Sequence, residues 1–170
     1  TADRSQDQTC ISASELVSID LQGAYLAPGF IDLHYHGSLI FADAKDLVAK
    51  LRASSARLVQ EGVTAFLPTT VASSQARLEE ILEVLAPVFE GNSSPRESLP
   101  RERTERTGWA RVAGGGAEPL GLHLEGPWIN AACAGAQPKA AIRAYDAAQG
   151  EAIFSRYGNA IRMVTLAPEI

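Results

Sequence analysis

The sequence predicts an α/β fold built from parallel strands and crossover helices. Two observations carry this prediction. Four short apolar runs rich in strand-forming residues are separated by stretches in which apolar residues recur at helical spacing. Polar side chains collect at the ends of these runs. Because a repeated β-α-β order favours a parallel sheet, and (β/α) barrels place their sites at the carboxyl ends of parallel strands, we expect part of a (β/α)8 barrel containing its first four strands.

The expected elements alternate along the chain. The strands are expected at 28–37, 63–71, 121–130 and 161–169. Apolar residues at helical spacing between Asp43 and Glu61 predict the first helix, with Gly62 as its stop. Ser73 or Ser74 is expected to cap the second helix. The third is expected at 144–157, where a glycine weakens the helical pattern.

Two segments fall outside this alternation. Residues 91–118 combine Pro, Ser and Gly with interleaved Arg and Glu, which is typical of a solvated surface insertion. Residues 1–27 contain short strand-like pieces, too little for a core of their own. We therefore expect two units: residues 1–27, and a barrel part over 28–170 that carries the insertion.

Composition and charge argue against several classes of protein. The chain has 170 residues, 46% of them apolar, and a formal net charge of −5, which suits one soluble domain. The mild acidity does not favour a nucleic-acid partner, and no apolar run approaches the roughly 20 residues of a membrane helix. The polar first ten residues are unlike a signal peptide. Cys10 and Cys133 are too few for a disulfide framework, so we expect a reduced, cytoplasmic setting.

Polar residues at the strand ends define a candidate site. His34 and His36 lie two residues apart and so share one face of the first strand. Thr69 and Thr70 end the second strand, where we expect them to satisfy backbone groups, with lining of the pocket as the alternative, and Glu125 ends the third. The histidines and Glu125 are therefore expected to face one pocket at the carboxyl edge of the sheet.

Two imidazoles and a nearby carboxylate are a ligand set for a divalent transition metal. Imidazole nitrogen and carboxylate oxygen both bind Zn²⁺ at about 2.0–2.2 Å, and the same set suits iron or cobalt. We predict that His34, His36 and Glu125 bind metal; the alternative is that the histidines are surface or hydrogen-bonded residues. His123 is either a hydrogen-bond partner of a metal ligand or a hydrogen-bonded interior histidine.

Four segments carry a resemblance to a known family. LAPGFIDLHYHG, VTAFLPTTV, GLHLEGPWIN and VTLAPE resemble, in this order, the N-terminal half of the N-acetylglucosamine-6-phosphate deacetylases of the amidohydrolase superfamily. The resemblance implies a metal-dependent barrel beside a small β-sandwich, of which residues 1–27 would be a remnant. It also implies hydrolysis of the acetamide of N-acetylglucosamine 6-phosphate to glucosamine 6-phosphate and acetate in amino-sugar catabolism.

The resemblance also implies roles for individual residues. Glu125 falls on the family's metal-binding glutamate, and His34 and His36 fall on the pair that binds a second metal in members that have one. One or two ions of zinc, iron or a similar metal are expected. Ala136 falls in a loop whose backbone contacts the sugar phosphate. The next position is usually histidine but here is Gln137, so substrate affinity or specificity is expected to differ.

The family's general base, an aspartate, is expected beyond residue 170, so no catalytic residue is assigned here. The chain resembles half of a barrel and is expected to be truncated and inactive alone, with a homodimer or a missing C-terminal half as its partner. Two alternatives stay open. One is a non-catalytic remnant of a truncated gene, and the other is a sister amidohydrolase acting on a cyclic amide.

Overall fold

The structure is a computed structural model that describes residues 18–89 and 115–169. Its strands are β1 (Phe30–Tyr35), β2 (Val63–Pro68), β3 (Glu118–Pro119), β4 (Leu122–Glu125) and β5 (Ile161–Thr165). Its α-helices are α1 (Leu47–Leu58), α2 (Gln75–Phe89) and α3 (Ala147–Tyr157). Short 3-10 turns lie at Leu39–Phe41, Ala44–Asp46, Val59–Glu61, Ala131–Cys133 and Lys139–Ala141.

All strand pairings in the described part of the chain are parallel. β2 lies between β1 and β3, and β4 pairs with β5. A parallel bridge between Thr69 and His123 joins the two sets of strands. The predicted α/β fold with parallel strands and connecting helices is therefore confirmed, although the third expected strand begins earlier than predicted and is divided into β3 and β4.

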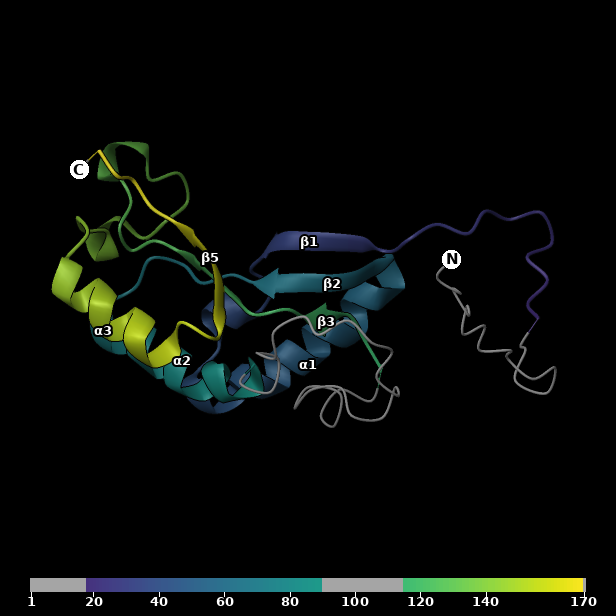
Figure 1. The fold of residues 1–170 in the computed structure, drawn as a ribbon. Coiled ribbons are helices and arrows are strands. Elements are labelled where there is room, and N and C mark those ends of the chain that lie inside the picture. Colours follow the sequence, from purple (N-terminus) through teal and green to yellow (C-terminus); the bar gives the residue numbers. More distant parts are fainter. Residues whose placement is uncertain (1–17, 90–114, 170) are drawn as a thin grey trace, which may run out of the picture.

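The three α-helices lie on one side of the strands (Figure 1), and the core fills the space between these layers. Phe66 of β2, Leu51 of α1 and Leu82 of α2 are fully buried there. Gly62 ends the first helical segment as predicted, because its φ of 83° is a conformation that glycine tolerates best. Ser74, rather than Ser73, caps α2 by accepting a hydrogen bond of 3.2 Å from Arg77 N. Among the described residues, no helix has the length and apolar character needed to cross a membrane.

The C-terminal end of the predicted insertion 91–118 is not a surface segment. Ala117 is fully buried, its N–H donates to Ser55 O at 3.0 Å, and its carbonyl accepts from Ser55 Oγ at 2.6 Å. Glu118 then pairs with β2 as part of β3. The prediction of a solvated insertion is therefore wrong for Ala117 and Glu118, because the first bonds helix α1 and the second pairs with β2, whereas Gly115 is exposed as predicted. Residues 90–114 lie outside the described part.

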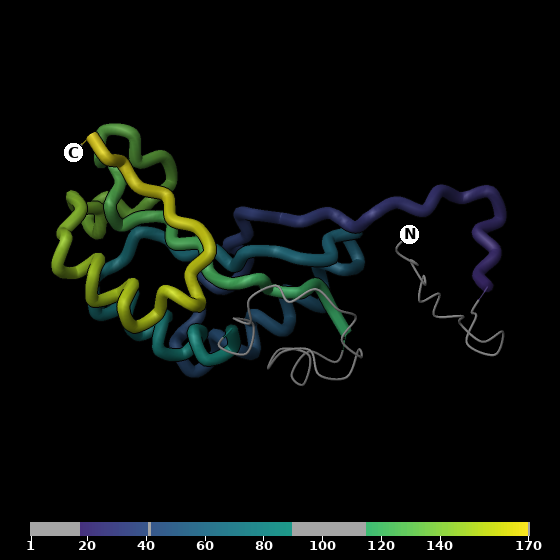
Figure 2. Tube along the Cα trace, viewed as in Figure 1, coloured from purple at the N-terminus to yellow at the C-terminus, as the bar shows by residue number. Residues whose placement is uncertain are grey.

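The described part of the N-terminal segment contains no strand over residues 18–27. These residues are exposed, including Tyr25 and Leu26, and the segment runs away from the rest of the molecule (Figure 2). The strand-like pattern predicted there does not form a strand, because no neighbouring strand among the described residues pairs with it. Residues 1–17 lie outside the described part.

The third helix begins at Ala147, later than predicted, because Asp146 caps it by accepting a hydrogen bond of 2.8 Å from Gln149 N. The glycine that weakens its pattern, Gly150, has a packing reason. A Cβ at this position would overlap the hydroxyl of Tyr145. The Tyr145 ring packs in turn against the fully buried Trp128, with ring centroids 5.1 Å apart.

Candidate metal centre

Three predicted ligands converge at the carboxyl edge of the sheet. His34 lies in β1, His36 follows its last residue, and Glu125 ends β4. The His34 and His36 Nε2 atoms are 3.0 Å apart, and they lie 3.4 Å and 3.0 Å from Glu125 Oε2. This group of three is the cluster in the described part of the chain whose ligand atoms could hold a metal ion.

Hydrogen bonding fixes which nitrogen of His36 faces the cluster centre. Its Nδ1 lies 3.1 Å from the backbone carbonyl of Thr69, which only accepts, so Nδ1 must carry a hydrogen. In the neutral ring, Nε2 therefore has a lone pair, and this lone pair faces the Glu125 carboxylate. Two acceptors at 3.0 Å repel each other unless a proton or a metal cation lies between them. A proton on Nε2 would make this contact an ion pair, and the same three side chains could instead hold a metal ion.

Besides the two histidines, Glu125 contacts a third side chain, that of Gln137. Gln137 Nε2 donates to Glu125 Oε2 at 2.7 Å, and Gln137 Oε1 accepts from Ala72 N at 2.7 Å. Gln137 is half-buried, whereas its neighbour Ala136 is exposed. The two residues predicted to contact substrate therefore have different surroundings: Ala136 is open to solvent, and the amide of Gln137 is engaged within the protein.

His123 is buried beside the cluster, with its ring centroid 5.0 Å from that of His34. Its Nδ1 lies 3.2 Å from Leu33 O and its Nε2 lies 2.8 Å from Thr165 Oγ1, so both nitrogens have partners. Burial, with a smaller contribution from the His34 charge, lowers the pKa of His123 below its usual value. Of the two alternatives, the contacts favour a neutral, hydrogen-bonded interior histidine that packs against the ring of His34.

The two threonines that end the second expected strand behave differently. Thr69 Oγ1 accepts from Tyr35 N at 3.1 Å and donates to Leu67 O at 3.0 Å, so it satisfies backbone groups as predicted. Thr70 Oγ1 is buried and has no hydrogen-bond partner among the described residues. The prediction is therefore wrong for Thr70, because successive side chains of an extended segment point to opposite faces.

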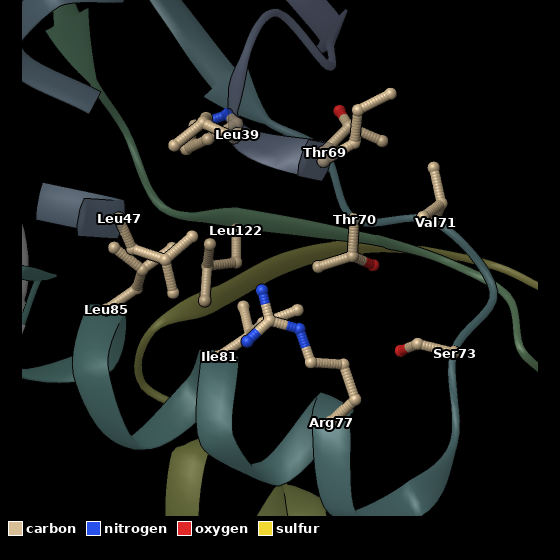
Figure 3. A pocket seen from close by; sticks show the side chains of 12 residues that line it. Leu39, Leu47, Thr69, Thr70, Val71, Ser73, Arg77, Ile81, Leu85 and Leu122 are labelled. Atoms are coloured by element: carbon tan, nitrogen blue, oxygen red, sulfur yellow. The ribbon is translucent and has the colours of Figure 1, made fainter. Parts of the chain in front are cut away.

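A hollow of about 490 Å³, including space open to solvent, lies on the face to which Thr70 points. Figure 3 shows Thr70 and Leu122 at its wall, with leucines of α1 and α2 opposite. Thr69 lines the hollow as well, and its Oγ1 lies 3.3 Å from Nδ1 of His123. The hollow is thus a largely apolar space between sheet and helices, and none of the three candidate ligands is among the residues that line it.

Sequence reasoning missed the contacts that surround the three ligands. Thr165, at the end of β5, bonds His123, and Ala72, in the segment before α2, bonds Gln137. The position of Thr165 at a strand end could have marked it, because the other polar residues of the site occupy such positions. No signal marks Ala72, since its contribution is a backbone N–H.

No model of a known protein family matches the chain. It is 37% identical over 145 residues to the N-acetylglucosamine-6-phosphate deacetylase of Bacillus subtilis, a match that covers 85% of this chain and 32% of the relative. It is 31% identical over 147 residues to the N-acetylgalactosamine-6-phosphate deacetylase of Escherichia coli O157:H7, a match that covers 85% of this chain and 33% of that relative. The chain thus spans about a third of the length of the curated relatives that it matches.

The fold gives the same result. The crystal structure of the N-acetylglucosamine-6-phosphate deacetylase from Thermotoga maritima aligns with a TM-score of 0.55 at 29% identity, covering 84% of this chain and 31% of that chain. In sequence and in fold, therefore, the chain corresponds to one part of the N-acetylglucosamine-6-phosphate deacetylases, and its resemblance to that family is confirmed.

Proposed function

We propose that this chain forms part of a metal-dependent deacetylase that hydrolyses the acetamide of N-acetylglucosamine 6-phosphate to glucosamine 6-phosphate and acetate. The observation that carries the proposal is the convergence of His34, His36 and Glu125 on one point, with ligand atoms 3.0–3.4 Å apart. The names of the relatives supply the reaction and the substrate class.

The spacing of the three atoms supports a metal ion. Metal–ligand bonds of about 2.1 Å that meet at roughly 90–110° place neighbouring ligand atoms about 3.0–3.4 Å apart. The three measured separations fall in this interval. The nitrogen and oxygen donors suit zinc, iron or cobalt, and the number of ions is one or two.

A bound metal would lower the pKa of its water and polarise the amide carbonyl. Neighbouring residues of the chain orient the two histidine ligands. Thr69 O holds His36 in the tautomer that directs Nε2 inward, and the ring of His123 limits the space beside His34. Trp128, fully buried against Tyr145, lies in the segment that leads to Ala136, the residue proposed to offer its backbone to the sugar phosphate.

A proton acceptor for the attacking water is still needed. Asp32, the carboxylate nearest in sequence to the two histidines, accepts a hydrogen bond of 2.9 Å from His34 N. We assign it a structural role within β1, deeper in the barrel than the histidines, and we place the general base in the part of the relatives that this chain does not span. The isolated chain is therefore expected to be inactive.

We further propose that the parallel strands are the first four strands of a (β/α)8 barrel over residues 28–170, and that residues 1–27 belong to a small β-sandwich. The exposed side chains of β1 support this arrangement: Phe30, Ile31 and Leu33 are 73%, 59% and 54% exposed on a strand that, within residues 18–89 and 115–169, pairs along one edge only. Such an edge favours pairing with further strands. Sedimentation velocity tests the point, since a chain that stays monomeric at high concentration would contradict it.

The experiment that tests the function has two steps. Equilibrium titration of the metal-free chain with Zn²⁺ should show one or two bound ions, and Glu125→Gln and His36→Ala should each weaken binding. Acetate release should then be measured with N-acetylglucosamine 6-phosphate and its galactosamine epimer, using the chain and the longest polypeptide encoded by its reading frame. A longer polypeptide that binds metal at Glu125 but releases no acetate from either sugar would refute the proposal.

A further inference from the structure

The side-chain amide of Gln137 joins two segments that are distant in sequence. One end meets Ala72, which is buried between β2 and α2, and the other meets Glu125 at the end of β4. Both hydrogen bonds are 2.7 Å long. A single side chain thus connects the carboxylate of the cluster to the backbone of the neighbouring strand–helix connection.

The partners leave one orientation for this amide. A backbone N–H only donates, so the Gln137 atom that faces Ala72 must be the oxygen. The nitrogen is thereby directed at Glu125, where a carboxylate oxygen only accepts. Reversing the amide would place a donor against a donor and an acceptor against an acceptor. The N–H of Ala72 therefore determines that Gln137 presents a donor to Glu125.

This donor acts on the oxygen that also faces the histidines. Glu125 Oε2 is the atom 3.0 Å from His36 Nε2 and 3.4 Å from His34 Nε2, and it accepts the bond from Gln137 as well. An ionised carboxylate oxygen has two lone pairs in fixed directions. A hydrogen bond on one of them limits rotation of the carboxylate and directs the other toward the histidines.

We infer that Gln137 is the positioning residue of Glu125: anchored by the Ala72 N–H, it holds Oε2 in the direction needed for a shared metal ion. The inference rests on the proposed metal site and adds to it a residue that acts through Glu125. It also limits the substrate role expected for Gln137, because the amide cannot rotate toward a ligand without losing one of two hydrogen bonds. One N–H of the amide remains for a ligand.

The test compares Zn²⁺ affinity in three variants by competition with a chromophoric chelator. Gln137→Leu removes both hydrogen bonds at similar size, and Gln137→Asn keeps the amide but is one methylene too short to span both partners. We expect each to bind Zn²⁺ about 10- to 100-fold more weakly, the range for residues that orient a metal ligand. Gln60→Leu, at an exposed position, should bind as the wild type does.

A structural effect is separated from positioning by Ser55→Ala, which removes a buried hydrogen bond far along the sheet from the cluster. It should lower the unfolding midpoint and leave Zn²⁺ affinity unchanged, whereas the Gln137 variants should change affinity. If the wild type binds Zn²⁺ and Gln137→Leu or Gln137→Asn binds it equally well, the inference is overturned while the metal site stands. If the wild type binds no Zn²⁺, the proposed function fails first, and the inference fails with it.

Discussion

Replacing each of the two adjacent threonines by valine should have opposite effects on stability. Thr69 and Thr70 are both buried, with 2% and 6% of their surface exposed. Valine has nearly the same shape as threonine, so each substitution removes a hydroxyl and leaves packing almost unchanged. The environments of the two hydroxyls therefore decide the results.

Thr69→Val leaves the N–H of Tyr35 facing a methyl group instead of an oxygen. An unsatisfied buried donor costs about 1–3 kcal/mol of stability. Thr70→Val removes a hydroxyl that has no partner among the described residues, so we expect no change or a gain of up to about 1 kcal/mol. Valine's strand preference applies to both variants and cancels in the comparison.

Urea unfolding at neutral pH measures the difference. With a slope of about 2 kcal/mol per M, a loss of about 2 kcal/mol shifts the midpoint of Thr69→Val down by roughly 1 M. Thr69→Val should also weaken metal binding, because the lost hydrogen bond from Tyr35 N holds the end of β1 beside His36, although the bond from His36 Nδ1 to the backbone carbonyl of residue 69 remains. Equal losses in the two variants, or a larger loss in Thr70→Val, would refute the reasoning.

Two further predictions concern buried hydroxyls elsewhere in the fold. Ser55→Ala should cost about 1–3 kcal/mol in urea unfolding, because the buried carbonyl of Ala117 loses its donor. An unchanged urea midpoint would contradict the packing of Ala117 against helix α1. Burial raises the pKa of Tyr157, so the folded state favours the neutral phenol. The resulting contribution to folding stability is fully present below about pH 10, the usual pKa of tyrosine, and is lost as the pH rises through the raised pKa. At neutral pH, Tyr157→Phe should therefore be at least as stable to unfolding as the wild type. Between roughly pH 8 and pH 11 it should lose less stability than the wild type does. An equal loss in the two proteins would show that ionisation of this phenol is not involved.

Much of the fold follows from local pattern. Glycine and serine signals at Gly62 and Ser74 identified a helix end and a helix start, and the order of apolar runs identified the parallel strands. The errors arose where composition was a poor guide to contacts. Ala117 sits beside a polar, glycine-rich stretch yet is buried, because helix α1 offers it two hydrogen bonds.

The sequence by itself determined that His34 and His36 share a face and that Glu125 ends a strand, because side-chain direction in a strand depends only on the alternation of neighbouring residues. Only the tertiary structure decided that Gln137 reaches Glu125, that Thr69 is bonded where Thr70 is not, and that both nitrogens of His123 are occupied. These contacts join segments distant along the chain, and their geometry depends on how strands and connections pack, which no local pattern encodes.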